Sequence, residues 1–262
     1  MIKYLIIICC LFIFSLPAAA ENNEVIILCY HQLVEENPQN SSEIKINDFK
    51  RQMEYLHENN YKTLSLEELK YYHQKGYFPE KSVVITFDDG YRTYFTEAFP
   101  ILEKYNFNSI IFPVVSYLSG ITDKKLWSEP LEFWDLRYMN TQSDLVKIGS
   151  HTYDLHYYRE NNQPAIIQKN NEEFEEYQKR IARDLRVSKE LLELQLNEVI
   201  IALAWPYGIR TNTAKKIALD TNFTMLFTIE AKPFTPRDNL YSIPRYVIKE
   251  GCLDYFKDIL NQ

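Results

Sequence analysis

The sequence Ser-Val-Val-Ile-Thr-Phe-Asp-Asp-Gly at residues 82–90 is the strongest indication of the fold. Its apolar and β-branched residues are typical of a strand buried on both faces. Adjacent strand side chains point to opposite faces, so Asp88 and Asp89 can serve one site only where the strand ends, and Gly90 supplies the turn. Since α/β enzymes place catalytic groups at the carboxyl ends of parallel strands, one acid can bind a metal while the other handles a proton. Two solvated turn aspartates are the alternative.

Strands and helices alternate on both sides of this segment. We expect further strands at residues 25–30, 109–114, 145–149, 199–204, 223–228 and 241–248. Helices are expected after an Asn47 cap, from a Ser65 and Glu68 capping box to residue 75, at residues 95–105, 130–139 and 213–219, and at the C-terminus. Repeated βα units predict an α/β fold, and we favour a single-domain (β/α) barrel over a wound sheet. The charged stretch at residues 172–196 is expected to be a solvated helix without a catalytic task.

The first twenty residues have the composition of a secretory signal. Lys3 precedes an apolar run at residues 4–16, and a proline and three alanines end the segment. This pattern predicts a signal peptide at residues 1–20 and one domain at residues 21–262. An uncleaved membrane anchor is the alternative, because the run is near the lower limit for a span. In both cases we expect a secreted or extracytoplasmic protein, at the cell surface or in the periplasm.

Charge and cysteine content exclude some functions. Removal of Lys3 with the leader changes the formal net charge from −7 to −8, and no basic cluster remains that would bind nucleic acid. Only Cys29 and Cys252 lie outside the leader, and two cysteines make no disulfide framework. Cys29 falls in a predicted strand, so we expect a small buried hydrophobic residue there.

Two histidines follow another predicted strand, in the sequence VKIGSHTYDLH at residues 146–156. His151 and His156 are five positions apart, which on a regular helix separates their directions by roughly 140°. They can face one ion only if the chain forms a loop between them. With an aspartate from another strand end, they would form a two-histidine, one-carboxylate metal site with open positions. Surface histidines are the alternative.

Two further strand ends carry candidate groups. In the sequence AWPYG at residues 204–208, the proline holds the backbone extended before Tyr207, whose N–H can face the oxygen of a reacting carbonyl. An ordinary turn is the alternative. His31 follows the first strand and would lie at the same rim of a parallel barrel, where it could act as a general acid.

These segments together resemble the polysaccharide deacetylases of the NodB-homology type, carbohydrate esterase family four. The resemblance spans residues 25–248, and TFDDG followed by GSHT is its specific part. In most of that family the second histidine follows the first by four positions and the acid histidine lies near the C-terminus. This chain departs from that pattern on both counts, and in these features it is most similar to the exported poly-β-1,6-N-acetyl-D-glucosamine deacetylases of biofilm matrix. That similarity implies a distorted seven-stranded NodB-type barrel with a circularly permuted motif order.

The resemblance also implies a role for each candidate residue. Asp89, His151 and His156 would hold one divalent metal ion, for which zinc, cobalt, nickel and iron are all suitable. Asp88 would be the base and His31 the acid, while the Tyr207 N–H would face the oxyanion. No counterpart of the family's Asp-x-x-Asp-Trp motif is found, so what orients Asp88 stays open.

Four other residues are candidates for contact with a sugar or with the base. Arg92 could touch sugar hydroxyls, although an early helix arginine is usually solvated. Arg245 could line the substrate site or pair with Asp88 and tune its basicity, and a structural ion pair elsewhere is the alternative. Trp127 and Trp134 could both stack on a sugar face, although we expect Trp134 in the core because it lies at a helix start with apolar neighbours.

The sequence thus favours an exported, metal-dependent hydrolase that removes N-acetyl groups from poly-β-1,6-N-acetyl-D-glucosamine and releases acetate. Peptidoglycan and chitin oligosaccharides are alternative substrates of the same reaction. A non-catalytic carbohydrate-binding barrel is a different alternative, although neither the base nor a ligand is missing. An amidase for small cyclic amides is disfavoured by the export signal. The expected partner is an N-acetylglucosamine polysaccharide, with association to a membrane or cell surface. The oligomeric state is not predicted.

Overall fold

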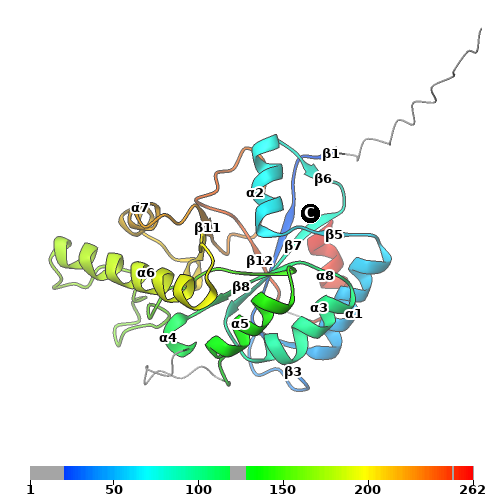
Figure 1. Ribbon diagram of the computed structural model, residues 1–262, viewed down its shortest axis with the longest axis horizontal. Coiled ribbons are helices and arrows are strands. Elements are labelled where there is room, and N and C mark those ends of the chain that lie inside the picture. Colours follow the sequence, from blue (N-terminus) through cyan, green and yellow to red (C-terminus); the bar gives the residue numbers. More distant parts are fainter. Residues whose placement is uncertain (1–20, 119–127, 250, 262) are drawn as a thin grey trace, which may run out of the picture.

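The computed structural model describes residues 21–118, 128–249 and 251–261 (Figure 1). The leader expected at residues 1–20 and Trp127 therefore lie outside the described residues. None of the helices in the described part combines the length and apolar character that crossing a bilayer requires.

An all-parallel, six-stranded sheet forms the centre of the molecule. Its order is β12 (Tyr246–Val247), β2 (Ile26–Tyr30), β7 (Ser82–Asp89), β8 (Ser109–Pro113) and β9 (Val146–Ile148), with β5 (Lys62–Thr63) paired to the start of β7. In register, Tyr30 lies opposite Phe87, and Asp89 lies opposite Pro113. Parallel pairing thus brings the ends of β2, β7 and β8 to one edge of the sheet.

A second parallel pair continues this arrangement. It consists of β10 (Ala202–Ala204) and β11 (Met225–Phe227). An isolated parallel bridge connects Leu203 of β10 with Ser150, shortly after β9. Another connects Phe227 of β11 with Ile243, shortly before β12. The predicted α/β class is confirmed, but the ladders of the described residues do not show a closed barrel or seven strands.

Five short strands were not predicted, and β5 of the central sheet is one of them. β1 (Glu21–Asn22) pairs antiparallel with β6 (Phe78–Pro79), and β3 (Gln32–Val34) pairs parallel with β4 (Glu43–Lys45). Strands of two or three residues are too short to show hydrophobic alternation, which explains why the sequence does not reveal them.

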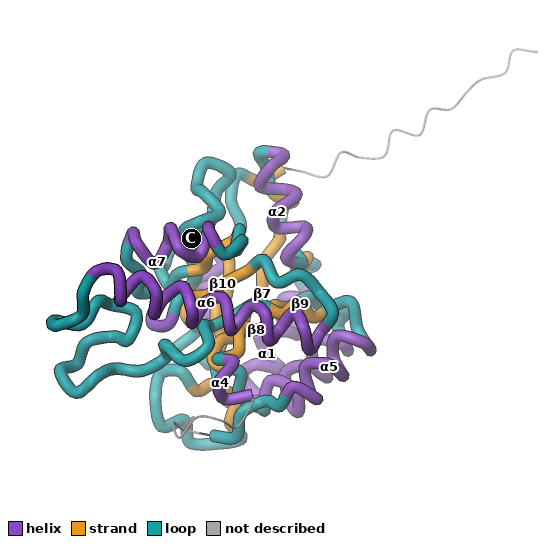
Figure 2. The backbone as a smooth tube through the Cα atoms, turned by 60° about the vertical axis from the view of Figure 1, so that its left-hand side comes forward, coloured by secondary structure: helices purple, strands orange, loops and turns teal. Residues whose placement is uncertain are grey.

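Helices surround the strands (Figure 2). They are α1 (Ile46–Glu58), α2 (Leu66–Lys75), α3 (Phe99–Lys104), α4 (Val115–Leu118), α5 (Phe133–Gln142), α6 (Phe174–Leu196), α7 (Asn212–Asp220) and α8 (Leu253–Leu260), with a π-helical turn at Tyr94–Ala98 and a 3-10 turn at Pro206–Gly208. The capping box of Ser65 and Glu68 is confirmed. The Asn47 cap is wrong, because α1 already begins at Ile46 and Lys45 precedes it without a side-chain cap.

The side chains of β2, β7 and β8 alternate between two hydrophobic clusters. Ile85 and Phe87 face the cluster shared with the surrounding helices, whereas Val84 faces a smaller cluster shared with β10 and β11. The strand period of two therefore places Asp88 on the same side as Val84, toward β10 and β11. The strand that fixes the fold thus also directs the first carboxylate of the site.

Candidate active site

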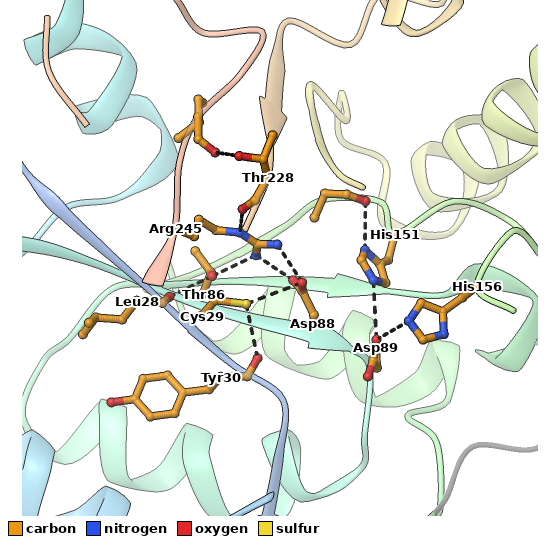
Figure 3. Close-up of polar contacts among 12 residues, drawn as sticks. Leu28, Cys29, Tyr30, Thr86, Asp88, Asp89, His151, His156, Thr228 and Arg245 are labelled. Atoms are coloured by element: carbon orange, nitrogen blue, oxygen red, sulfur yellow. Dashed lines mark hydrogen bonds and ion pairs between the residues drawn. The ribbon is translucent and has the colours of Figure 1, made fainter. Parts of the chain in front are cut away.

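The two acids at the end of β7 diverge. Asp88 and Asp89 are only 2% and 6% exposed, so neither is a solvated turn residue. Asp89, the last residue of β7, has a positive φ of 70°, followed by 83° at Gly90, so the turn already begins at the second acid. The side chain of Asp89 consequently points toward the histidines, while Asp88 stays over the sheet (Figure 3).

Asp89 and both histidines form one cluster. The Nε2 atoms of His151 and His156 lie 3.4 and 3.2 Å from Oδ1 of Asp89. All three residues offer a ligand atom within 4.8 Å of the others. The structure thus brings the three predicted metal ligands together, from the end of β7 and from the loop after β9.

The protonation of this cluster favours a cation. The Nδ1–H of His151 donates to the carbonyl of Ala204 at 2.8 Å, so the Nε2 lone pair of the neutral ring faces Asp89. Burial lowers the pKa of His151 to about 3 and that of His156 to about 4, and it raises the pKa of Asp89 to about 6. Asp89 Oδ1 is buried and has no hydrogen-bond partner among the described residues. Two neutral nitrogens around such an oxygen fit the donor set of a divalent metal, and the Ala204 carbonyl would hold the tautomer.

Asp88 is paired with Arg245. Two guanidinium nitrogens, Nη1 and Nη2, donate to its two carboxylate oxygens, each at 2.7 Å. Arg245 is 0% exposed, and its remaining donors reach the Thr228 carbonyl and the Thr86 hydroxyl. Burial by itself would raise the pKa of Asp88, but the Arg245 charge outweighs it and holds that pKa well below its usual range. The structure therefore selects the pairing with Asp88 over an ion pair elsewhere, and the burial of Arg245 leaves it no surface for a sugar.

A second set of groups contacts Asp88 from the end of β2. Cys29, His31 and Asp88 each offer a ligand atom within 4.8 Å of the other two. The Cys29 thiol is buried, as expected, and it also donates to Asp88 Oδ2 at 3.5 Å. The sequence did not predict this polar contact. Nδ1 of His31 is buried without a hydrogen-bond partner in the described part of the chain. His31 thus lies beside the predicted base, as its place after the first strand indicated.

Tyr207 lies against the other side of the cluster. Its backbone is left-handed, with φ of 59° and ψ of 13°, inside the turn at Pro206–Gly208. The ring stacks on His156 with centroids 4.6 Å apart and packs on Tyr158 at 4.5 Å. The structure therefore brings this residue to the cluster, and its ring helps to fix the imidazole of His156.

The remaining predicted residues lie apart from this cluster. Arg92 donates to Glu129 at 2.9 Å and lies 3.8 Å from Asp135, so its charge is directed to one acid that precedes α5 and to another in the first turn of α5. Trp134 is 53% exposed and stacks on Tyr138, so the expectation of a core residue was wrong. The side chain faces solvent because α5 buries Asp135, Leu136 and Met139 instead.

Sequence reasoning missed Asp184, in the helix to which it assigned no catalytic task. This carboxylate is buried and accepts hydrogen bonds from the backbone of the loop between the two histidines. A signal was present, because Tyr177, Ile181, Asp184 and Ser188 recur at helical spacing on one face of α6, and all four are buried.

Comparisons of sequence and of fold relate this chain to known proteins. The family model described as polysaccharide deacetylase matches residues 75–226. The poly-β-1,6-N-acetyl-D-glucosamine N-deacetylase of Staphylococcus epidermidis is 28% identical over 247 residues, which covers 89% of this chain and 82% of that protein. The protein of the same name from Staphylococcus aureus is 27% identical over 248 residues, with 90% and 82% covered.

Solved structures of similar fold include a de-N-acetylase from Aggregatibacter actinomycetemcomitans and IcaB from Ammonifex degensii. The first has a TM-score of 0.78 and 24% identity and covers 90% of this chain and 99% of its own. The second has a TM-score of 0.78 and 24% identity and covers 92% and 97%. At this identity the likeness concerns the fold.

Proposed function

Since this chain belongs to the polysaccharide deacetylase family, we propose that it hydrolyses N-acetyl groups of poly-β-1,6-N-acetyl-D-glucosamine and releases acetate. Two relatives of that name, matched over 82% of their length, support the choice of substrate. The observation that carries the proposed chemistry is the convergence of the His151 and His156 Nε2 atoms on one buried oxygen of Asp89.

These three residues would hold one divalent cation, with zinc, cobalt, nickel and iron as candidates. Such a cation supplies Lewis acidity, which acidifies water and polarises a carbonyl. The charge of Arg245 keeps Asp88 ionised, so its carboxylate can accept the proton of an attacking water. A carboxylate with so low a pKa is a weak base, so this step requires an acidified water.

The other groups of the site have complementary tasks in this mechanism. The Tyr207 N–H would donate to the oxyanion that develops from the acetamide carbonyl. His31, in its protonated form, would donate to the departing amine and leave a glucosamine unit. The Tyr207 ring would keep the His156 imidazole in place through their stacking contact.

Three finer points belong to the same proposal. We propose that the two sheets form a NodB-type barrel closed through the bridges at Ser150 and Phe227. Residues 1–20 are proposed to direct export, so that residues 21–262 act outside the cytoplasm on matrix polysaccharide. Sugar contacts by Arg92 and Trp127 stay proposals, and for Arg92 they would require exchange of its Glu129 partner.

Acetate release from defined oligomers tests this function. Purified protein would be incubated with β-1,6-linked N-acetylglucosamine oligomers, chitin oligomers and peptidoglycan fragments, and its bound metal would be analysed. We expect acetate release to be fastest from the β-1,6 oligomers. Faster release from chitin or peptidoglycan would overturn the substrate, and no release from any of them by metal-loaded protein would favour a binding protein.

A further inference from the structure

The loop between His151 and His156 directs both imidazoles toward Asp89. Histidines five positions apart diverge on a helix, yet both Nε2 atoms approach Asp89 here. The chain achieves this with a left-handed backbone at Thr152, whose φ is 73°. Such a conformation is unfavourable for a β-branched residue, so surrounding contacts must stabilise the loop.

The strongest of these contacts comes from α6. The Oδ1 and Oδ2 atoms of Asp184 accept hydrogen bonds from the backbone N–H groups of Tyr153 and Asp154, each at 2.9 Å. These are the two consecutive residues at the centre of the interval between His151 and His156. A carboxylate that accepts two backbone N–H bonds forms charge-assisted hydrogen bonds, which are stronger than neutral ones.

Other contacts hold the same loop but act on its first residue, Thr152, and on its carbonyls. Ser188, one turn further along α6, accepts a hydrogen bond from the Ser150 hydroxyl at 3.0 Å, and that hydroxyl accepts from the Thr152 N–H at 3.0 Å. The carbonyls of Thr152 and Tyr153 accept from the backbone at the start of α4. Asp184 therefore holds the two central N–H groups of the turn, whereas the N–H groups of Thr152 and Leu155 on either side donate to hydroxyls within the loop.

A carboxylate at position 184 is unfavourable if the residue serves only the stability of the fold. Its side chain lies on the buried face of α6, where burial raises its pKa to about 7. A buried carboxylate is expensive to desolvate, and an apolar residue would pack on this face at lower cost. The two N–H groups of the loop supply the reason for a carboxylate at this position.

We propose that Asp184 is the positioning residue of the metal site, and that its carboxylate sets the directions of the His151 and His156 imidazoles by holding the turn between them. This inference rests on the proposed cation site. It assigns to α6 a role in building the site, although α6 contributes no ligand.

Cobalt binding tests the inference without using activity. Wild type, Asp184→Asn and Glu190→Gln would be titrated with Co²⁺, and the visible d–d spectrum would report the coordination geometry. Asn keeps the size of Asp but turns an NH₂ group toward one of the two N–H donors. Glu190 is an exposed residue of the same helix, so its change is the matched control. Urea unfolding of each variant would show that the metal-free proteins are folded.

We expect Asp184→Asn to weaken Co²⁺ binding about 10- to 100-fold and to change the spectrum, with Glu190→Gln equal to wild type. If Asp184→Asn bound Co²⁺ with the affinity and the spectrum of the wild type, the positioning role of Asp184 would be overturned, while the cation site would stand. Failure of wild type to bind Co²⁺ would overturn the cation site itself, so the two failures are distinguishable.

If Asp184→Asn does not fold, amide hydrogen exchange of the wild type gives the answer. The N–H groups of Tyr153 and Asp154 should be protected with and without Co²⁺, because Asp184 holds them in both states. Rapid exchange of both in the cobalt-loaded protein would overturn the inference.

Discussion

Replacement of Arg245 by Met removes the counter-charge of the proposed base. The side chain is 0% exposed and donates to both oxygens of Asp88, to the Thr86 hydroxyl and to the Thr228 carbonyl. Methionine fills a similar volume but leaves the buried carboxylate without a partner. Loss of one member of a buried ion pair costs about 3–5 kcal/mol. We therefore expect Arg245→Met to lower the free energy of unfolding by about 3–5 kcal/mol at pH 7.

The pH dependence of this loss has a definite sign. In the wild type the pKa of Asp88 lies below its unfolded value, so the pair stabilises the protein above about pH 4, and this contribution falls as the pH drops further. In the variant, burial without Arg245 raises the pKa of Asp88 above the unfolded value. Protonation then favours the folded state, so the difference in stability between the two proteins should shrink as the pH falls from 7 toward 4.

Urea unfolding at several pH values between 4 and 8, followed by circular dichroism, measures this difference. Arg186→Met is the control, because Arg186 is exposed and lies 3.9 Å from its acidic partner, so its loss should change stability by less than about 0.5 kcal/mol. If Arg245→Met lowered the free energy of unfolding by less than about 1 kcal/mol at pH 7, the reasoning would be refuted, because loss of one partner of a buried ion pair should cost more than this. A difference that stays constant with pH would refute it as well.

Three further predictions concern the strand end and the cluster. Asp88→Asn should reduce deacetylation about 10²- to 10⁴-fold while bound metal stays at the wild-type level, because the base is lost and the three ligands remain; full activity would exclude Asp88 as the base. His156→Ala should lose metal on dialysis, because one of three protein ligands is absent, and metal analysis that finds wild-type content would remove His156 from the site. Gly90→Ala should destabilise the fold by about 1–3 kcal/mol in urea unfolding, because its Cβ would lie 2.7 Å from the Pro113 Cβ at a φ of 83°; unchanged stability would show that the turn relaxes freely.

The central strands could be predicted from sequence because they are buried on both faces. β2 and β7 appear in the sequence as runs of apolar and β-branched residues. The structure places them at Ile26–Tyr30 and Ser82–Asp89, where the sequence predicts strands at 25–30 and 82–87. The later strands are shorter than expected. The run at residues 199–204 gives a strand only at Ala202–Ala204, because Val199 is exposed and takes no part in the sheet. Apolar character alone does not show where strand pairing ends.

The clustering of Asp89 with the two histidines could also be predicted, since each follows a strand and parallel strands end at one edge. The partner of Arg245 could not be decided, because it depends on the pairing of β12 with β2 and of β2 with β7. Those pairings place residues 157 positions apart in sequence within hydrogen-bond distance. A single sequence contains no local signal for such a register.

Helix surfaces were the hardest part to predict. The charged composition of α6 indicated a solvated helix, but one of its faces is buried and carries Asp184. In α5 an aromatic residue was expected in the core, but Trp134 faces solvent and its acidic neighbour Asp135 is buried. Composition averages over all faces of a helix, whereas burial depends on which face meets the sheet.

Crystallography of the protein loaded with Zn²⁺ or Co²⁺ tests the central claim most directly. The account predicts one anomalous peak bounded by Asp89 Oδ1 and the Nε2 atoms of His151 and His156, with metal–ligand distances of about 2.0–2.2 Å. A peak at another place, or no peak with the two imidazoles turned away from Asp89, would contradict it.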